Sequence, residues 1–388
     1  MTSRPATGAP RGPSPLGFDP WLLAAVLLLT GFGLVMVYSA SAVTAAARVH
    51  DEFYFLKRQL LAAAAGVAFL ALLLRVGYRR LEPVSTPLLF LVLASLVAVL
   101  LPGVGRVAGG ARRWIDLGAF SFQPAEAAKV ALVLYLARSL SRKKERMRIF
   151  SVGFLPHVLV TGALVGLVLL ERDLGTAVIL VLLLFVMLFA GGVKLGYLAG
   201  AVLAAALAGY EVVVHTRYRM DRVTAFLEPW KYRDGIGFQI VESLLGIGNG
   251  GFAGQGLGQG KGKLFYLPAA HTDFIAAVVA EETGLLGTAL LLGLFAVLVW
   301  RGLRATLSAP DAFGCYLALG LTTLFGAQAL VNLAVVFGML PTKGLTLPFV
   351  SYGGSSLVTL LAGAGMLLSA SAGAGGFLRA PRAAGGTP

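Results

Sequence analysis

Three carboxylates stand in one apolar stretch of this sequence. The segment YLPAAHTDFIAAVVAEE has Asp273 near its start and Glu281 and Glu282 inside it. A charged side chain near the centre of a bilayer costs at least ~2.5 kcal/mol, so the two glutamates must face a polar cavity, pair with a cation or be protonated. On a helix they lie about 12 Å from Asp273. A proton or ion relay and a buried structural pair both remain open for them.

Asp273 occupies the position where a helix is expected to begin. A carboxylate there can cap free N–H groups and interact favourably with the helix dipole. It can also act as a general base that takes a proton from a hydroxyl. His271, two residues earlier, is interpreted as a hydrogen-bonding or interfacial residue. The spacing alone leaves a structural and a catalytic role open for Asp273.

Cationic residues occur in the other polar segments of the chain. Arg113 stands beside Trp114, and Arg222 ends a basic run. Lys343 lies between two prolines. Several cations near a membrane surface suit a phosphate or pyrophosphate on a lipid.

A glycine-rich segment precedes the Asp273 stretch. GNGGFAGQGLGQGKGK (248–263) has a glycine at almost every second position and carries Lys261 and Lys263. Glycine lets the backbone approach a ligand closely and present its N–H groups. A flexible loop is the alternative. The segment is not a P-loop, because it lacks GK[ST] and no strand precedes it.

The composition is that of a membrane protein. The 388 residues are 57% apolar and 13% charged, with a mean hydropathy of +0.83. Ordinary soluble domains are about one quarter charged. Only helices or closed barrels satisfy the backbone in lipid, and long apolar runs without two-residue alternation favour helices. The single cysteine, Cys315, excludes a disulfide framework and a cysteine zinc cluster.

The apolar runs predict an all-α polytopic membrane protein with about ten transmembrane helices. The membrane domain covers residues 18–372, and residues 1–17 and 373–388 are expected to be disordered cytoplasmic tails. Residues 214–272 are too many for a simple connector and form a large extracytoplasmic loop between helices seven and eight. The ten spans are expected at 21–41, 58–75, 86–101, 124–140, 152–170, 174–190, 195–213, 273–300, 313–337 and 347–370.

Basic residues predict the orientation of these spans. The run RSLSRKKERMR (138–148) marks its own side as cytoplasmic. An even number of spans then puts both termini inside, and it puts Asp273 and the large loop outside. The formal charge of +14 is interpreted as membrane anchors that contact anionic lipid, rather than as a nucleic-acid surface.

Two later segments carry polar residues into the membrane. Glu126 and Lys129 are three residues apart on one expected helix and can form a structural pair. Pro348 is expected to open the last helix, and Ser351 belongs to a polar face of small residues that lets helices pack closely. The sequence has no Ser-His-Asp arrangement and no HExxH. Residue chemistry thus leaves two activities open: group transfer from a lipid pyrophosphate to an alcohol, and transport of a lipid-linked anion.

Several long motifs resemble one family. RRWIDLG with FSFQPAEAAK, DLGTAV, IGNGG with GQGLGQG, LPAAHTDFIAAVVAEETG and LPTKGLTLPFVSYGGSS are similar, in this order, to the signatures of the SEDS proteins (shape, elongation, division and sporulation). The resemblance covers residues 20 to 370. The PTKGLT form, with Lys343, resembles the cell-division branch more closely than the rod-elongation branch.

The resemblance implies a ten-helix peptidoglycan glycosyltransferase of the bacterial cytoplasmic membrane. Such an enzyme polymerises lipid II through β-1,4 bonds and releases undecaprenyl pyrophosphate during cell wall synthesis. Its partner is a class B penicillin-binding protein with transpeptidase activity, and other division or elongation membrane proteins are further expected partners. A lipid II flippase and a non-enzymatic division scaffold are the alternatives.

The resemblance also assigns roles to residues. It places the essential aspartate at Asp273, the expected general base, which is also the residue that could bind a divalent cation such as Mg or Mn. Substrate contacts are expected from Lys343, Arg113, Trp114, Arg222, Gln239, Ser243, Lys261, Lys263, His271 and Ser351. Supporting polar groups are expected at Glu126, Lys129, Glu281 and Glu282.

The sequence departs from the family pattern at four places. Ala269 replaces a glutamate two residues before His271, which leaves Asp273 as the better candidate for the base. The pair Glu171-Arg172 replaces Gln-Pro before the DLGTA motif. Ala125 and Asn249 each replace a serine.

Overall fold

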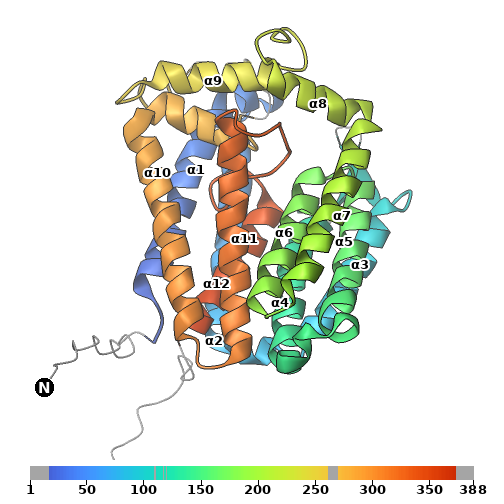
Figure 1. The fold of residues 1–388 in the computed structure, drawn as a ribbon. Coiled ribbons are helices and arrows are strands. Elements are labelled where there is room, and N and C mark those ends of the chain that lie inside the picture. Colours follow the sequence, from blue (N-terminus) through green and yellow to red (C-terminus); the bar gives the residue numbers. More distant parts are fainter. Residues whose placement is uncertain (1–16, 109–110, 117, 119, 261–269, 373–388) are drawn as a thin grey trace, which may run out of the picture.

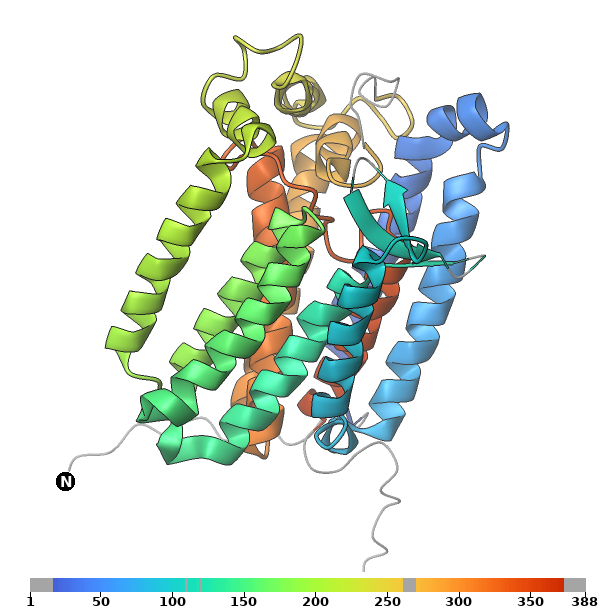
Figure 2. The same cartoon turned by 90° about the vertical axis from the view of Figure 1, so that its right-hand side faces the viewer.

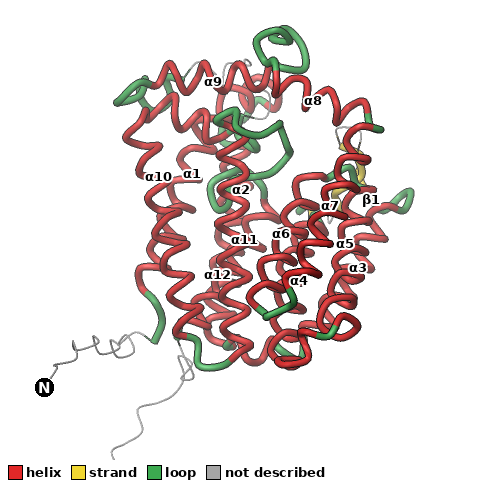
Figure 3. The backbone as a smooth tube through the Cα atoms, in the orientation of Figure 1, coloured by secondary structure: helices red, strands yellow, loops and turns green. Residues whose placement is uncertain are grey.

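The computed structural model describes residues 17–108, 111–116, 118, 120–260 and 270–372. Within these residues the chain forms twelve α-helices and one small sheet (Figures 1 and 3). The helices are α1 (Pro20–Val49), α2 (Tyr54–Val76), α3 (Ser85–Leu100), α4 (Pro124–Lys143), α5 (Leu155–Leu170), α6 (Leu174–Ala190), α7 (Leu195–Val214), α8 (Arg217–Leu227), α9 (Phe238–Gly250), α10 (Ile275–Ser308), α11 (Ala312–Val336) and α12 (Gly354–Ser371). The predicted all-α fold with many spans is confirmed.

Each of the ten predicted spans overlaps with one helix. Seven segments of the described chain are long and apolar enough to cross a membrane, and α3 and α6 are shorter apolar helices. The tenth span, α4, is interrupted by charged residues such as Glu126 and Lys129. The two remaining helices, α8 and α9, lie in the loop between α7 and α10.

The spans form one bundle, and α8 and α9 cross one end of it (Figures 1 and 2). Helix α9 lies against the end of α11. The buried Ser243 hydroxyl of α9 donates there to the carbonyl of Val336 over 2.8 Å. That carbonyl belongs to the last turn of α11 and has no partner within the helix. At the opposite end, the Asp19 N–H donates to Ser371 Oγ over 3.2 Å. The first and last helices therefore begin and end at the same side of the bundle.

Helix α10 is kinked next to its glutamates. Gly284 has φ 64° and ψ −159°, which breaks the helical hydrogen bonding around it. The glycine-rich segment supplies the missing partners: the N–H groups of Gln255 and Gly256 donate to the carbonyls of Glu281 and Glu282, over 3.0 Å each. A Cβ at Gly254 would lie 2.2 Å from the Glu282 carbonyl oxygen.

These contacts decide the role of the described glycines. Over residues 251–256 the backbone completes the hydrogen bonding of α10, so these residues form neither the expected flexible loop nor a backbone cradle for a ligand. Gly250 and Gly254 must lack a side chain, because a Cβ at these positions would lie 2.0 Å and 2.2 Å from carbonyl oxygens of α10. Lys261 and Lys263, which were expected to contact substrate, lie outside the described residues.

A three-stranded antiparallel sheet connects α3 to α4, and the sequence pattern did not predict it. Its strands are β1 (Gly105–Ala108), β2 (Ala111–Asp116) and β3 (Ser121–Phe122), in the order β1-β2-β3. Arg106 on β1 pairs with Trp114 on β2. The sheet thus holds Arg106, Arg113 and Trp114 at the end of the bundle where α8 and α9 lie (Figure 2).

The last helix begins later than predicted. Helix α12 starts at Gly354, so Pro348 does not open it and Ser351 does not lie on its face. Residues 337–353 instead form a folded connection, here called the α11–α12 loop. Phe349 in this loop has φ 64°, a left-handed conformation that ends any helical run. Gly33 on α1 accommodates the loop, because a Cβ there would lie 2.6 Å from Val350 Cα.

Candidate active site

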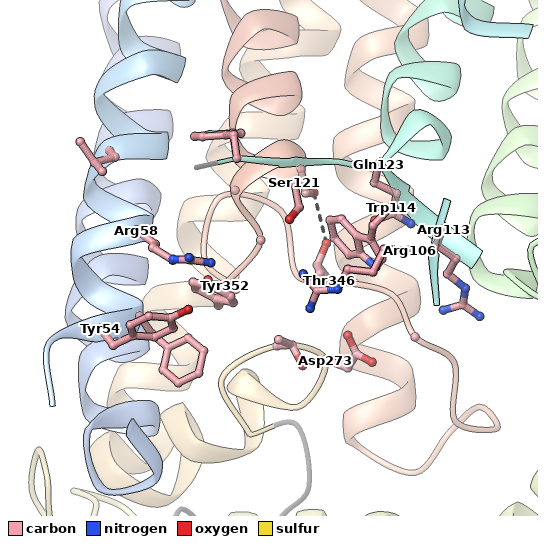
Figure 4. A pocket seen from close by; sticks show the side chains of 18 residues that line it. Tyr54, Arg58, Arg106, Arg113, Trp114, Ser121, Gln123, Asp273, Thr346 and Tyr352 are labelled. Atoms are coloured by element: carbon pink, nitrogen blue, oxygen red, sulfur yellow. Dashed lines mark hydrogen bonds between the residues drawn. The ribbon is translucent and has the colours of Figure 1, made fainter. Parts of the chain in front are cut away.

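A cavity of about 570 Å³ lies where the sheet, the start of α2, the segment before α10 and the α11–α12 loop meet (Figure 4). Three arginines from separate elements line it: Arg58 from α2, Arg106 from β1 and Arg113 from β2. Asp273 lines the same cavity. A carboxylate and three cations therefore share one space, and of the cations predicted from the sequence Arg113 is among them.

Asp273 is not a helix cap. Helix α10 begins at Ile275, its N-cap residue is Phe274, and no side chain caps it. Within the described chain, the Asp273 carboxylate forms no hydrogen bond or ion pair. Burial, with a smaller contribution from nearby Asp173, raises the pKa of Asp273 to about 6 against the opposing effects of Arg222 and Arg113. A carboxylate with this pKa and no competing partner can accept a proton near neutral pH.

The backbone that carries Asp273 is held at three successive carbonyls. The carbonyl of His271 accepts the Tyr352 N–H over 2.9 Å, and that of Thr272 accepts the Ser351 hydroxyl over 2.6 Å. The carbonyl of Asp273 accepts the Asn332 side-chain amide over 2.8 Å. Ser351 and Asn332 thus contact the segment that positions the carboxylate rather than the cavity itself.

Arg113 is oriented by backbone oxygens. Its Nε donates to the Glu171 carbonyl over 2.9 Å and its Nη2 to the Arg172 carbonyl over 2.7 Å. Its Nη1 lies 3.9 Å from the position that a Cβ at Gly344 would occupy, and Asp273 Oδ2 lies 3.5 Å from the same point. Two nitrogens therefore anchor the guanidinium, while the third and the Asp273 carboxylate both border the space next to Gly344.

An aromatic wall on the other side of the cavity was missed at the sequence level. Arg58 lies over the ring of Tyr54 at 4.7 Å, and Tyr352 lies on the same side in Figure 4. His271 packs 4.6 Å from the ring of Phe55, and burial lowers the pKa of His271 to about 4, with a smaller effect from Arg48. The sequence of α2 is that of an apolar span with basic residues near its start, and this pattern does not predict that its side chains line a cavity.

Behind the cavity lies a buried polar network. Lys129 Nζ contacts Glu126 Oε1 over 2.9 Å, so the predicted pair three residues apart is confirmed. The same nitrogen donates to Gln328 over 2.8 Å, and the Ser356 hydroxyl donates to Glu126 over 2.8 Å. Gln328 also donates to the Thr346 carbonyl over 3.0 Å. The network joins α4, α11, α12 and the α11–α12 loop, and each buried charge in it has a partner.

Other predicted site residues lie outside the cavity wall. Arg222 donates to the Thr342 carbonyl over 2.9 Å and contacts Tyr218, so it attaches α8 to the α11–α12 loop. Lys343 is half-buried in that loop, and burial lowers its pKa. Gln239 lies on α9, like Ser243.

The two intramembrane glutamates are buried next to the α10 kink. Glu282 accepts the Ser39 hydroxyl over 2.5 Å and the Gly258 N–H over 3.0 Å. Neither Glu281 nor Glu282 lines the cavity. These contacts favour the structural reading of Glu282 over an ion relay.

The described residues contain no group of three or more His, Cys, Asp or Glu side chains that could hold a metal ion. Asp173, the acid nearest to Asp273 in electrostatic terms, has its oxygens bound by the N–H and hydroxyl of Thr176 over 2.9 Å each.

Comparison with known proteins identifies the family. The model of the cell cycle proteins FtsW, RodA and SpoVE matches residues 20–374. A probable peptidoglycan glycosyltransferase FtsW of Trichlorobacter lovleyi is 49% identical over 90% of this chain and 91% of that protein. Stage V sporulation protein E of Bacillus subtilis is 42% identical over 89% of this chain and 95% of that protein.

Solved structures show the same fold. One chain, from work on structural coordination of polymerization and crosslinking by a peptidoglycan synthase complex, has a TM-score of 0.76 at 34% identity, over 91% of this chain and 97% of that chain. RodA of Thermus thermophilus has a TM-score of 0.67 at 32% identity, over 92% of this chain and 97% of that chain. The expected SEDS membership is thus confirmed, and the chain belongs to the FtsW/RodA/SpoVE family of cell cycle proteins.

Proposed function

We propose that this chain is a peptidoglycan glycosyltransferase that polymerises lipid II during cell division. One observation carries the proposal: Asp273, with no hydrogen bond from the described chain, shares a cavity with Arg58, Arg106 and Arg113. A free carboxylate suits a base, and cations in a cavity suit a pyrophosphate. The similarity to relatives described as probable FtsW glycosyltransferases supports the same activity.

The geometry supports one displacement step. Asp273 takes the proton from the 4-hydroxyl of an acceptor GlcNAc while that oxygen attacks the anomeric carbon of a donor MurNAc. The bond between this carbon and the pyrophosphate oxygen breaks, and undecaprenyl pyrophosphate leaves with the electron pair. The α linkage inverts to β. Arg113 is our first candidate to stabilise the charge that develops on the leaving group.

Lys343 and Arg222 remain predictions for the same role. Each lies in or against the α11–α12 loop, close to the cavity but not in its wall. A divalent cation, Mg or Mn, also stays a prediction. It would take its oxygens mainly from the substrate pyrophosphate, because protein sites for Mg²⁺ often supply only one or two carboxylates.

We further propose a membrane setting and a partner. The termini would face the cytoplasm and the cavity the outside, as the basic runs indicate. The similarity to a chain of a peptidoglycan synthase complex supports assembly with a class B penicillin-binding protein.

The test is polymerisation of purified lipid II by wild type and Asp273→Ala, each with and without a cognate class B penicillin-binding protein. We expect long glycan strands from wild type and none from Asp273→Ala. Glu228→Ala is the matched control, because Glu228 is exposed and pairs only with Lys231 among the described residues. Strands of normal length from Asp273→Ala would refute the role of Asp273. No polymer from wild type with its partner, together with lipid II movement across vesicles, would favour the flippase.

A further inference from the structure

Asn332 on α11 joins the two segments that border the carboxylate of Asp273. It is 2% exposed, and its Nδ2 donates to the Asp273 carbonyl over 2.8 Å and to the Leu345 carbonyl over 2.6 Å. A side-chain amide nitrogen has two hydrogens, so both are used. The two carbonyls are far apart in sequence and come from the start of α10 and from the α11–α12 loop.

The orientation of this amide is costly. Asn332 Oδ1 is buried and has no hydrogen-bond partner in the described chain. A buried acceptor without a partner is unfavourable. Turning the amide over would place this oxygen against two carbonyl oxygens, so the two donated hydrogen bonds determine the orientation. Such an unpaired group calls for an explanation.

The second carbonyl belongs to the residue that follows Gly344, which borders the Asp273 carboxylate. Leu345 follows Gly344, and a Cβ at Gly344 would lie 3.5 Å from Asp273 Oδ2. Asn332 therefore ties the backbone of the base to the backbone that lies against its carboxylate. One turn earlier on α11, Gln328 holds the next loop residue, Thr346, by a similar bond of 3.0 Å.

We propose that Asn332 is a positioning residue that sets where the Asp273 carboxylate stands in the cavity. The inference rests on the proposed function of Asp273 as the base. Without the shared amide, the two segments keep the hydrogen bonds of Tyr352 and Ser351 to the carbonyls of His271 and Thr272, but the carbonyls of Asp273 and Leu345 lose the side chain that holds both of them. A displaced base slows the chemical step more than it weakens substrate binding, because the substrate's other contacts remain.

The test compares Asn332→Leu, which keeps the approximate volume and removes both donors, with Thr322→Val. Thr322 is a matched control, because it is 2% exposed on the same helix and its hydroxyl is also unpaired in the described chain. For Asn332→Leu we expect kcat to fall about 10- to 100-fold and KM for lipid II to stay within about threefold. The acid limb of the kcat profile should move to lower pH, because a loosened Asp273 reaches water.

A purely structural role predicts another result. It would lower the active fraction equally at every pH, and the acid limb would stay in place. That outcome, or a loss of kcat no greater than in Thr322→Val, would overturn the inference. If Asn332→Leu does not fold, Asn332→Asp replaces it, because this variant keeps the shape but has one donor at most.

Hydrogen exchange separates this inference from the proposed function. Residues 270–275 and 342–353 should exchange faster in Asn332→Leu than in wild type and unchanged in Thr322→Val. This readout needs no turnover. If wild type makes no polymer, the proposed function fails, but the exchange data still test whether Asn332 holds the two segments in place. If wild type polymerises and these segments exchange normally in Asn332→Leu, the inference alone fails.

Discussion

Gly344 lies directly against the carboxylate of Asp273. A Cβ at Gly344 would lie 3.5 Å from Asp273 Oδ2 and 3.9 Å from Arg113 Nη1, which is ordinary van der Waals contact. A methyl group therefore fits at this position, whereas a larger side chain must enter the cavity between the base and the arginine.

We expect Gly344→Ala to keep polymerisation within about threefold of wild type and Gly344→Leu to lose it by about 100-fold. Thermal unfolding of both variants should match wild type, because Gly344 is exposed. Equal activity of the two variants would contradict the placement of substrate between Asp273 and Arg113.

The pKa of Asp273 predicts opposite effects on activity and stability. Burial raises it to about 6 from 3.8, so activity should rise with pH as Asp273 ionises through this value. The folded state holds the proton more tightly than the unfolded state, so the contribution of Asp273 to stability is present below pH 3.8 and is lost as pH rises through about 6.

The variant Asp273→Asn checks the predicted direction of the change in stability with pH. It should be inactive at every pH and yet unfold about 2 °C or more above wild type at pH 8, with little difference at pH 4. The measurement is thermal unfolding in detergent at both pH values. A lower unfolding temperature at pH 8 would mean that the ionised carboxylate is stabilised by its surroundings.

Glu171 should limit activity at alkaline pH. It is fully buried and neither of its carboxyl oxygens has a hydrogen-bond partner among the described residues. Burial raises its pKa to about 8, Asp173 adds to the shift and Arg113 opposes it. Glu171 is thus mostly neutral at pH 7, and its ionisation would place a negative charge beside Arg113 and weaken pyrophosphate binding.

We expect Glu171→Gln to retain polymerisation at pH 7 within about threefold and to extend activity above pH 8, where wild type declines. It should also be more stable than wild type at pH 9, because the raised pKa costs stability as pH rises from 4.5 through about 8. Overlapping pH profiles of the two proteins above pH 8 would exclude this role.

Arg58 should bind an anion of the substrate. It lines the cavity above the Tyr54 ring and forms no ion pair within the described residues, whereas Arg106 pairs with Asp116 over 3.4 Å. We expect Arg58→Ala to raise KM for lipid II about 10-fold or more, with Arg58→Lys in between, since lysine cannot bind in a bidentate manner. Steady-state kinetics measure this, with Arg75→Ala as the control in the last turn of α2.

The glycine-rich segment should matter for stability rather than for ligand binding. Gly254 has φ 82°, and a Cβ there would lie 2.2 Å from the Glu282 carbonyl oxygen. Gly248 has no atom within 4 Å of its Cβ position. Gly254→Ala should therefore destabilise the protein by about 2 kcal/mol or more, and Gly248→Ala should be neutral or slightly stabilising. Comparable unfolding temperatures for both variants would show that the backbone around Gly254 can shift to accept a Cβ without a large loss of stability.

The sequence by itself determined the features that depend on neighbouring residues. Most of the predicted spans are local apolar runs, so the sequence predicted a helix at each of the ten places, and the Glu126–Lys129 pair followed from helical spacing alone. The spacing around Asp273 left a capping and a catalytic role open, and the family resemblance pointed to the base. Arg113 and Trp114, which the resemblance made candidates for substrate contacts, line the cavity.

Only the tertiary structure decided the features that depend on distant segments. Arg58 reaches the cavity because the start of α2 lies beside residues 272 and 352, and Asn332 supports Asp273 because α11 packs against the start of α10. The glycines around 254 are required by a kink more than 25 residues later in the chain. Pro348 and Ser351 suggested a helix start, but the Gln59 side chain donates to the Ser351 carbonyl and the Ser351 hydroxyl donates to the Thr272 carbonyl, and these long-range bonds hold the segment as a loop. Local patterns specify helices, whereas these partners are specified by packing between segments that are far apart in the sequence.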